Sequence, residues 1–166
     1  MTSVCNFQYD LKVMNAQNVE YAEHVGRYWS DRGGNRAQGK MLGWLLISDP
    51  PHQSSKQLQE VLHMSAGTVS TNARILEQIG FIERITFPKD RATYYRMATD
   101  AWEYLLDEKR TGMIGLRKIA DEGREVLTDA PPEQHERINQ LAELMEFMDV
   151  EMAALAQRWH ARKEAR

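Results

Sequence analysis

The chain has 166 residues, of which 42% are hydrophobic, and its formal net charge is −3. This length suits one compact domain with a helical extension, and the apolar fraction is sufficient for a core. The negative charge argues against a protein that coats nucleic acids without preference. Residues 56–98 nevertheless hold six Lys and Arg against four Asp and Glu, which makes this part of the chain the most basic.

The cellular location is predicted from features that the sequence lacks. Cys5 is the only cysteine, which rules out an internal disulfide and fits a reducing compartment. The N-terminus has no basic segment followed by an apolar one, and the chain has no run of about 18 apolar residues. We therefore expect a cytoplasmic protein with neither a signal peptide nor a membrane span.

The N-terminal part of the chain predicts an arm and two helices. Residues 1–17 show no clear period and form the expected arm, whereas the apolar spacing over 18–31 and 35–48 is helical. The second helix is apolar nearly all round at its end, which indicates burial. Trp44 and the Tyr-Trp pair at 28–29 either pack in the core or line a ligand pocket, and core packing is the simpler interpretation.

Two short helices joined by a tight turn are predicted next. Ser54 and Gln57 are three residues apart and fit a capping box at the start of a helix that ends near Leu62. Ser65 is a good N-cap for the second helix, and Gly80 is placed to end it. The short turn between the two helices is typical of a helix-turn-helix.

A two-stranded ribbon is predicted after these helices. Segments 81–86 and 93–97 are rich in β-branched and aromatic residues, as strands are. Residues 87–92 form a polar tip between them, with a proline placed to start a turn. The fold class is therefore mainly α with a small β ribbon, namely a winged helix-turn-helix followed by long C-terminal helices.

The second short helix has a small, hydroxylated face opposite its apolar face. Small residues at a helix N-terminus let the backbone approach phosphates, while hydroxyl and Arg side chains can reach base edges in the major groove. Cations at the ribbon tip fit contacts to the DNA backbone or the minor groove. The alternative is a solvated helix face without a partner. The predicted DNA-binding residues are Ser55, Lys56, Ser65, Gly67, Thr68, Ser70, Thr71, Arg74, Lys89 and Arg91.

Three stretches carry a family resemblance: M-S-A-G-T-V-S-T-N-A-R-I-L-E-Q at 64–78, G-W-L-L-I-S-D at 43–49, and the wing residues at 90–95. Over about residues 20–105 the chain resembles the MarR superfamily of bacterial regulators, most closely its GbsR-like branch. The resemblance implies a homodimeric, sequence-specific regulator, usually a repressor and often released by a small ligand. Many members carry D-x-R-R in the wing, whereas here only Arg91 carries over.

Two long helices are predicted after the wing. The first covers about 100–127 and contains glycines at 112, 115 and 123, which predict a bend or the close approach of another helix. The second covers about 133–163 and has apolar residues spaced alternately by three and four, as in a coiled-coil seam. The seam folds back on the preceding helix, pairs with a second chain, or does both, and Leu144, Phe147 and Ala154 widen it in favour of both. The predicted dimer interface is Ile138, Leu141, Met145, Met148, Met152, Leu155 and Trp159.

No catalytic or metal-binding pattern is visible, because the five histidines are scattered and neither a phosphate-binding glycine loop nor a nucleophile elbow occurs. We therefore expect neither an enzyme nor a metal or cofactor. The sequence predicts an arm at 1–17, a DNA-binding domain at 18–98 and a dimerisation region at 99–166. Its expected partners are double-stranded DNA at a pseudo-palindromic operator and a second copy of the chain, and the resemblance adds a small-molecule effector. A winged helix that binds a protein instead of DNA is the alternative, which the weak basicity and the single wing arginine keep open.

Overall fold

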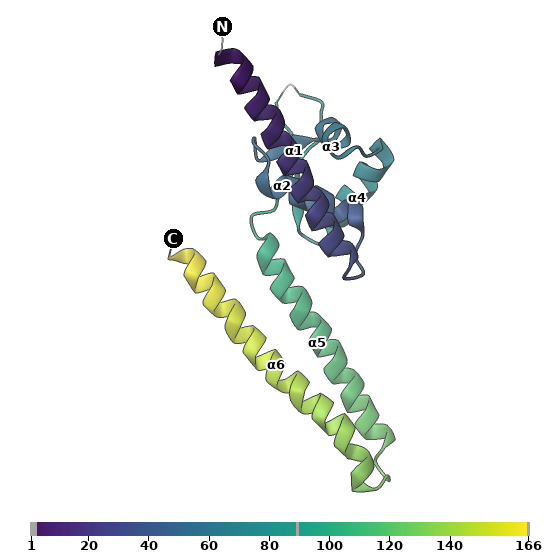
Figure 1. Ribbon diagram of the computed structural model, residues 1–166. Coiled ribbons are helices and arrows are strands. Elements are labelled where there is room, and N and C mark those ends of the chain that lie inside the picture. Colours follow the sequence, from purple (N-terminus) through teal and green to yellow (C-terminus); the bar gives the residue numbers. More distant parts are fainter. Residues whose placement is uncertain (1–2, 89, 166) are drawn as a thin grey trace. The chain divides into compact units, whose positions relative to one another are not determined.

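A computed structural model describes residues 3–88 and 90–165 of the chain. The chain divides after Ala101 into two compact units, called unit 1 and unit 2. Unit 1 contains α1 (Ser3–Ser30), α2 (Arg36–Ile47), β1 (His52–Ser54), α3 (Ser55–Leu62), α4 (Ala66–Gln78), β2 (Ile82–Ile85) and β3 (Tyr94–Met97) (Figure 1). Unit 2 is built from α5 (Ala101–Val126) and α6 (Pro132–Glu164). None of the described helices is long and apolar enough to cross a membrane.

The helices α1 and α2 pack against each other at a crossing lined by small residues. Ala22 and Gly26 on α1 meet Gly39 and Gly43 on α2, and the spacing of four places each pair on one helix face. A Cβ atom on Gly39 would lie 2.8 Å from the Cα atom of Gly26, and one on Gly43 would lie 3.0 Å from that of Ala22. The two backbones therefore lie closer together than larger side chains would allow.

The start of α1 differs from the prediction. The helix that was expected from residue 18 begins at Ser3, because no proline or glycine interrupts residues 3–25. The interpretation of Trp44 as a core residue is confirmed, since its side chain is buried. Tyr28 is half exposed and lies under the guanidinium of Arg32, 3.6 Å from the ring centroid.

The predicted caps of the helix-turn-helix are confirmed. The backbone N–H of Ser54 donates to Gln57 Oε1 at 2.7 Å, and the N–H of Gln57 donates to Ser54 Oγ at 3.1 Å, which completes the capping box of α3. At the end of α4, Gly80 adopts a φ of 76°. The N–H of Phe81 donates to the carbonyl of Leu76 at 2.9 Å, so α4 ends in a Schellman motif. These caps fix both ends of the two-helix segment.

The small sheet has one strand more than the sequence predicted. Its order is β1-β3-β2, and β3 pairs antiparallel with both neighbours. In the added strand His52 pairs with Arg96 and Ser54 pairs with Tyr94. The core of unit 1 lies between α2, α3, α4 and this sheet, and its largest fully buried side chains are Met41, Leu58, Leu62, Leu76 and Val69.

Unit 2 is a helical hairpin in which α5 and α6 run antiparallel (Figure 1). Arg110 donates to Asp149 at 3.0 Å across the hairpin. A Cβ atom on Gly123 would lie 2.8 Å from Ile138 Cδ1. Of the three glycines where a bend or a close approach was predicted, this is the one that α6 approaches closely. In the described part of unit 2 the buried side chains are Ala120, Ala142 and Met145.

Candidate nucleic-acid interface

The N-terminus of α4 is capped and open to solvent. Ser65 Oγ accepts a hydrogen bond from the N–H of Thr68 at 3.1 Å and shares a second one with Thr68 Oγ1 at 2.8 Å. A Cβ atom on Gly67 would meet only Ser65 Oγ, at 3.9 Å. The first N–H groups of a helix have no acceptor within it, and they carry the positive end of the helix dipole. This exposed end of α4 is therefore suited to an anion such as a phosphate.

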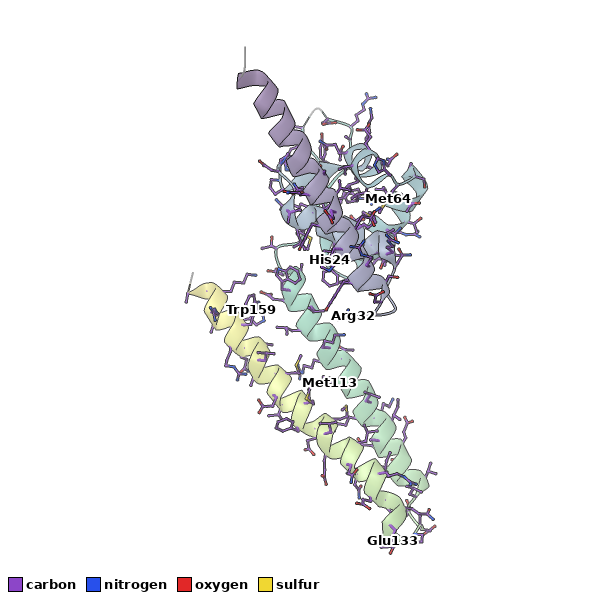
Figure 2. All side chains as sticks on the ribbon, viewed as in Figure 1. His24, Arg32, Met64, Met113, Glu133 and Trp159 are labelled. Carbon is purple, nitrogen blue, oxygen red and sulfur yellow. The ribbon has the colours of Figure 1, made fainter. Side chains whose placement is uncertain are left out.

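The remaining predicted residues of α4 lie on its outer face. Ser70, Thr71 and Arg74 are exposed, and none of the described residues forms an ion pair with Arg74. The opposite face packs into the core through Val69, Asn72, Ala73 and Leu76. Met64, which lies in the turn before α4, is labelled in Figure 2. The helix is thus held by one face and offers hydroxyl and guanidinium groups on the other.

The predicted residues of α3 lie at its N-terminus. Lys56 is exposed and forms a 3.8 Å ion pair with Glu60, one turn along the same helix. Ser55 is half-buried, and its Oγ accepts a hydrogen bond from Gln59 Nε2 at 3.2 Å. Lys56 is therefore the more accessible of the two residues.

The wing is shaped by Asp90, whose carboxylate does not pair with Arg91. Asp90 accepts hydrogen bonds from the N–H of Ala92 at 2.8 Å and from the Tyr94 hydroxyl at 2.7 Å. These donors, Ala92 first, lower the pKa of the Asp90 carboxyl, and the same contact raises the pKa of the Tyr94 phenol. Arg91 is exposed and has no ion-pair partner in the described part of the chain. The predicted contact Lys89 lies outside the described residues.

Two features that the sequence reasoning missed hold the wing in place. His52, Phe87 and Tyr94 form an aromatic cluster at its base, with ring centroids 4.9 to 5.6 Å apart. Arg84 on β2 forms two hydrogen bonds to the Glu77 carboxylate on α4, at 3.1 and 3.0 Å, which raise the pKa of the guanidinium. These two hydrogen bonds therefore join β2, the first strand of the wing, to α4. No sequence pattern marks these contacts, because their partners lie on different elements.

The predicted dimer residues are distributed between the inside and the outside of the hairpin. Met145 is buried, and Ile138 packs on Gly123 of α5, so this part of the seam contacts the same chain. Leu155 and Trp159, which is labelled near the C-terminal end of α6 in Figure 2, are exposed. The described residues contain no group of three or more His, Cys, Asp or Glu arranged to hold a metal ion.

Comparison with known proteins places this geometry among transcriptional regulators. Residues 35–92 match the model of the MarR family, and residues 100–162 match the model of MmpR5-like MarR family transcriptional regulators. The HTH-type transcriptional regulator MmpR5 of Mycobacterium tuberculosis (strain ATCC 25618 / H37Rv) is 40% identical over 131 residues, which cover 79% of each chain. A crystal structure of a transcriptional regulator is 37% identical, with a TM-score of 0.73 over 87% of this chain and 99% of that chain.

Proposed function

This chain belongs to the MarR family of DNA-binding transcriptional regulators, and from that membership we propose that it acts as a homodimeric repressor. The family consists of regulators and not of enzymes, so the chain performs no catalysis. The proposed target is a pseudo-palindromic operator, read by two copies of α4. The observation that carries the proposal is the outer face of α4, which is exposed and unpaired while the opposite face is packed in the core.

The proposed roles of the DNA-binding residues follow from their positions. Residues at the capped N-terminus of α4 contact the phosphate backbone, and residues further along its outer face contact base edges. The start of α3 and the wing add phosphate or minor-groove contacts. The backbone group comprises Ser55, Lys56, Ser65, Gly67 and Thr68, the base-reading group Ser70, Thr71 and Arg74, and the wing group Lys89 and Arg91.

The support for a homodimer comes from unit 2. A hairpin that buries so few side chains leaves much apolar surface in water, and such surface marks an interaction site. Leu144, Phe147 and Val150 of α6 are 52%, 60% and 63% exposed, and Ile119 of α5 is 57% exposed. We propose that a second copy of the chain covers this surface together with the part of the predicted seam that the hairpin leaves accessible, namely Leu141, Met148, Met152, Leu155 and Trp159. The two-fold axis of such a dimer relates the two copies of α4.

The finer parts of the proposal rest on the resemblance. Release by a small-molecule effector and membership of the GbsR-like branch follow from the motif strings of α4 and the wing, and action in the cytoplasm follows from the DNA target. We propose a DNA-binding domain at 18–98 and a dimerisation region at 99–166, and the arm expected at 1–17 forms the first turns of α1 from Ser3 onward. The boundary between the two units, after Ala101, supports the last of these limits.

Selection of a random duplex library on the purified protein tests the proposal. We expect enrichment of an inverted repeat whose half-sites lie one helical turn apart, about 34–36 Å between centres. Light scattering at micromolar concentration should give the mass of two chains. The mass of one chain would refute the proposed dimer, and a library without any enriched sequence would refute sequence-specific binding.

Two variants assign the roles on the selected operator. Arg74→Ala should cost about 1–3 kcal/mol and relax the preference at one base position, because a base contact is lost. Arg91→Ala should weaken all duplexes alike and reduce the salt dependence of binding by about one counterion. If both variants bind as the wild type does, the assignment of the interface is wrong.

A further inference from the structure

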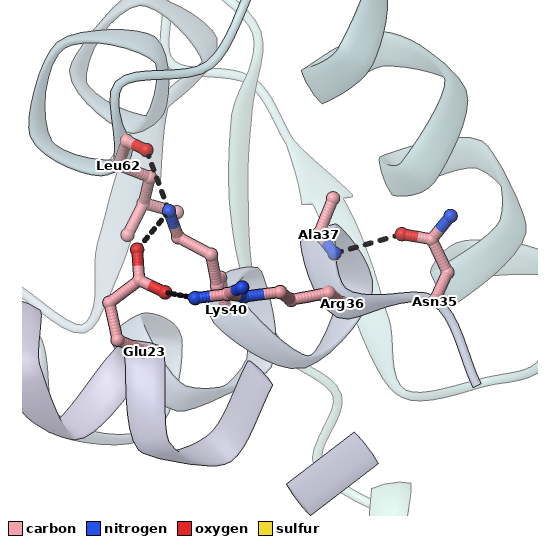
Figure 3. A network of polar contacts seen from close by, with 6 residues as sticks. All are labelled: Glu23, Asn35, Arg36, Ala37, Lys40 and Leu62. Atoms are coloured by element: carbon pink, nitrogen blue, oxygen red, sulfur yellow. Dashed lines mark hydrogen bonds and ion pairs between the residues drawn. The ribbon is translucent and has the colours of Figure 1, made fainter. Parts of the chain in front are cut away.

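A polar network joins α1, α2 and the end of α3 through Lys40 (Figure 3). The Lys40 ammonium forms an ion pair with one carboxylate oxygen of Glu23 and donates to the carbonyl of Leu62 at 3.0 Å. The other carboxylate oxygen of Glu23 accepts from Arg36 at 2.9 Å. The Lys40 side chain is 15% exposed, whereas that of Arg36 is 57% exposed. Lys40 is therefore the shielded centre of the network, and Arg36 is its solvent-facing edge.

The carbonyl that Lys40 binds lies at the start of the turn between α3 and α4. Leu62 is the last residue of α3, and a cation is favourable at the C-terminal end of a helix dipole. His63 follows in the left-handed region with a φ of 52°, and the N–H of Met64 donates to the carbonyl of Gln59 at 3.0 Å. Ser65, the N-cap of α4, comes next. The Leu62 carbonyl thus lies three residues before the N-cap, at the start of the turn that leads into α4.

The other end of the network is anchored to a rigid pair of helices. Glu23 and Lys40 flank the crossing of α1 and α2, where Gly26 and Gly39 leave no space for a Cβ atom. The hydrogen bond from Lys40 is the largest cause that lowers the pKa of the Glu23 carboxyl, so the carboxylate is charged at neutral pH. Because the two helices cannot slide without a clash, Lys40 is held at a fixed place on the α1–α2 pair, and its bond to the Leu62 carbonyl links that pair to α3.

We propose that Lys40 is a positioning residue for DNA binding, which holds the turn before α4 against the α1–α2 pair. In this way it sets the orientation of α4, the reading helix. The inference rests on the DNA-binding function proposed above. Lys40 itself contacts no DNA in this role. Its effect reaches the operator through the Leu62 carbonyl, the left-handed turn and the N-cap of α4.

Affinity for the selected operator, measured over a range of salt concentrations, separates this role from a phosphate contact. Lys40→Met removes the ammonium and keeps most of the stem, and should weaken operator binding by about tenfold, which corresponds to about 1.4 kcal/mol. The salt slope should stay at the wild-type value, because no phosphate contact is lost. A slope smaller by about one would show that Lys40 neutralises a phosphate, and would overturn the inference.

Two variants serve as matched controls for the charge and for the network. Lys40→Arg keeps a cation able to reach both acceptors and should bind within about threefold of the wild type. Arg36→Met removes the exposed partner of Glu23, leaves the bond to Leu62 intact, and should also stay within about threefold. Equal losses in Lys40→Met and Arg36→Met would attribute the effect to the α1–α2 contact instead of the turn.

Amide hydrogen exchange reports directly on the turn and does not depend on DNA. In Lys40→Met the hydrogen-bonded amides of His63, Met64 and Thr68 should exchange about tenfold faster than in the wild type, while those of α2 keep their protection. A variant that is folded by circular dichroism and shows wild-type exchange and affinity would refute the positioning role. Failure of the proposed function is a different result, since the wild type itself would then enrich no operator.

Discussion

Adding a methyl group at Gly39 should force the crossing of α1 and α2 apart. The new Cβ atom would lie 2.7 Å from Trp29 Cβ, 2.8 Å from Gly26 Cα and 2.9 Å from the Val25 carbonyl oxygen. Two of these atoms belong to the backbone, so the helices must separate by about 0.6 Å to restore ordinary contact. Overpacking of this kind costs about 1–3 kcal/mol, and the higher helix propensity of alanine returns up to about 1 kcal/mol. Because two of the contacts are with backbone atoms, the cost lies toward the upper end of its range, at about 2–3 kcal/mol, and we expect Gly39→Ala to lower the free energy of unfolding by about 1–2 kcal/mol.

The same substitution at Gly112 is a matched control with the opposite sign. Gly112 lies inside α5, and a Cβ atom there would meet nothing within 4 Å. Gly112→Ala should therefore raise the free energy of unfolding by about 0.5–1 kcal/mol. Urea unfolding at one fixed protein concentration measures both variants, since association of the chain would make stability depend on concentration. A Gly39→Ala protein as stable as the wild type would refute the argument from close packing.

Three further outcomes are expected. Gly67→Ala should leave the free energy of unfolding unchanged or raise it by up to about 1 kcal/mol, yet weaken operator binding at least about tenfold, because the methyl group blocks the approach of a phosphate; an unchanged dissociation constant would contradict this. Because the pKa of Glu23 is lowered on folding, its carboxylate stabilises the fold at pH values above its unfolded pKa of about 4.5. This stability is lost as the pH falls through the folded pKa, so acidification should lower the free energy of unfolding more in the wild type than in Glu23→Gln. Tyr94→Phe should raise the pKa of the Asp90 carboxyl, followed by carbon NMR, and an unshifted titration would argue against the wing hydrogen bond.

The parts of the fold that were predictable are those fixed by local chemistry. Ser54 with Gln57, Ser65 and Gly80 were identified as helix boundaries because a capping hydrogen bond joins residues a few positions apart. The outer face of α4 followed from its period, since burial of Val69 and its neighbours leaves the hydroxylated face outside. The capping signals lie within a few residues of the helix end, and the periodic signal lies within the single helix that it defines.

The parts that were missed depend on partners far along the chain. The strand β1 has only three residues, and it exists because His52 pairs with Arg96 on β3. The ion pair of Glu23 with Lys40 joins two helices whose register is set by glycine packing. A single sequence shows the residues of such contacts but not which of them meet, because the pairing is decided by tertiary structure.

The reading helix is held at both ends by contacts of this non-local kind. At its N-terminus the turn is fixed by the bond of Lys40 to Leu62, and at its C-terminus Glu77 is joined to Arg84 of the wing. The contact to Leu62 precedes α4, whereas Glu77 lies one turn beyond Arg74 and borders the C-terminal end of the outer face. Both contacts are charge-assisted and directional, so they add to the apolar packing that orients the helix. The orientation of α4 therefore does not depend on its outer face, where Ser70, Thr71 and Arg74 are exposed to solvent.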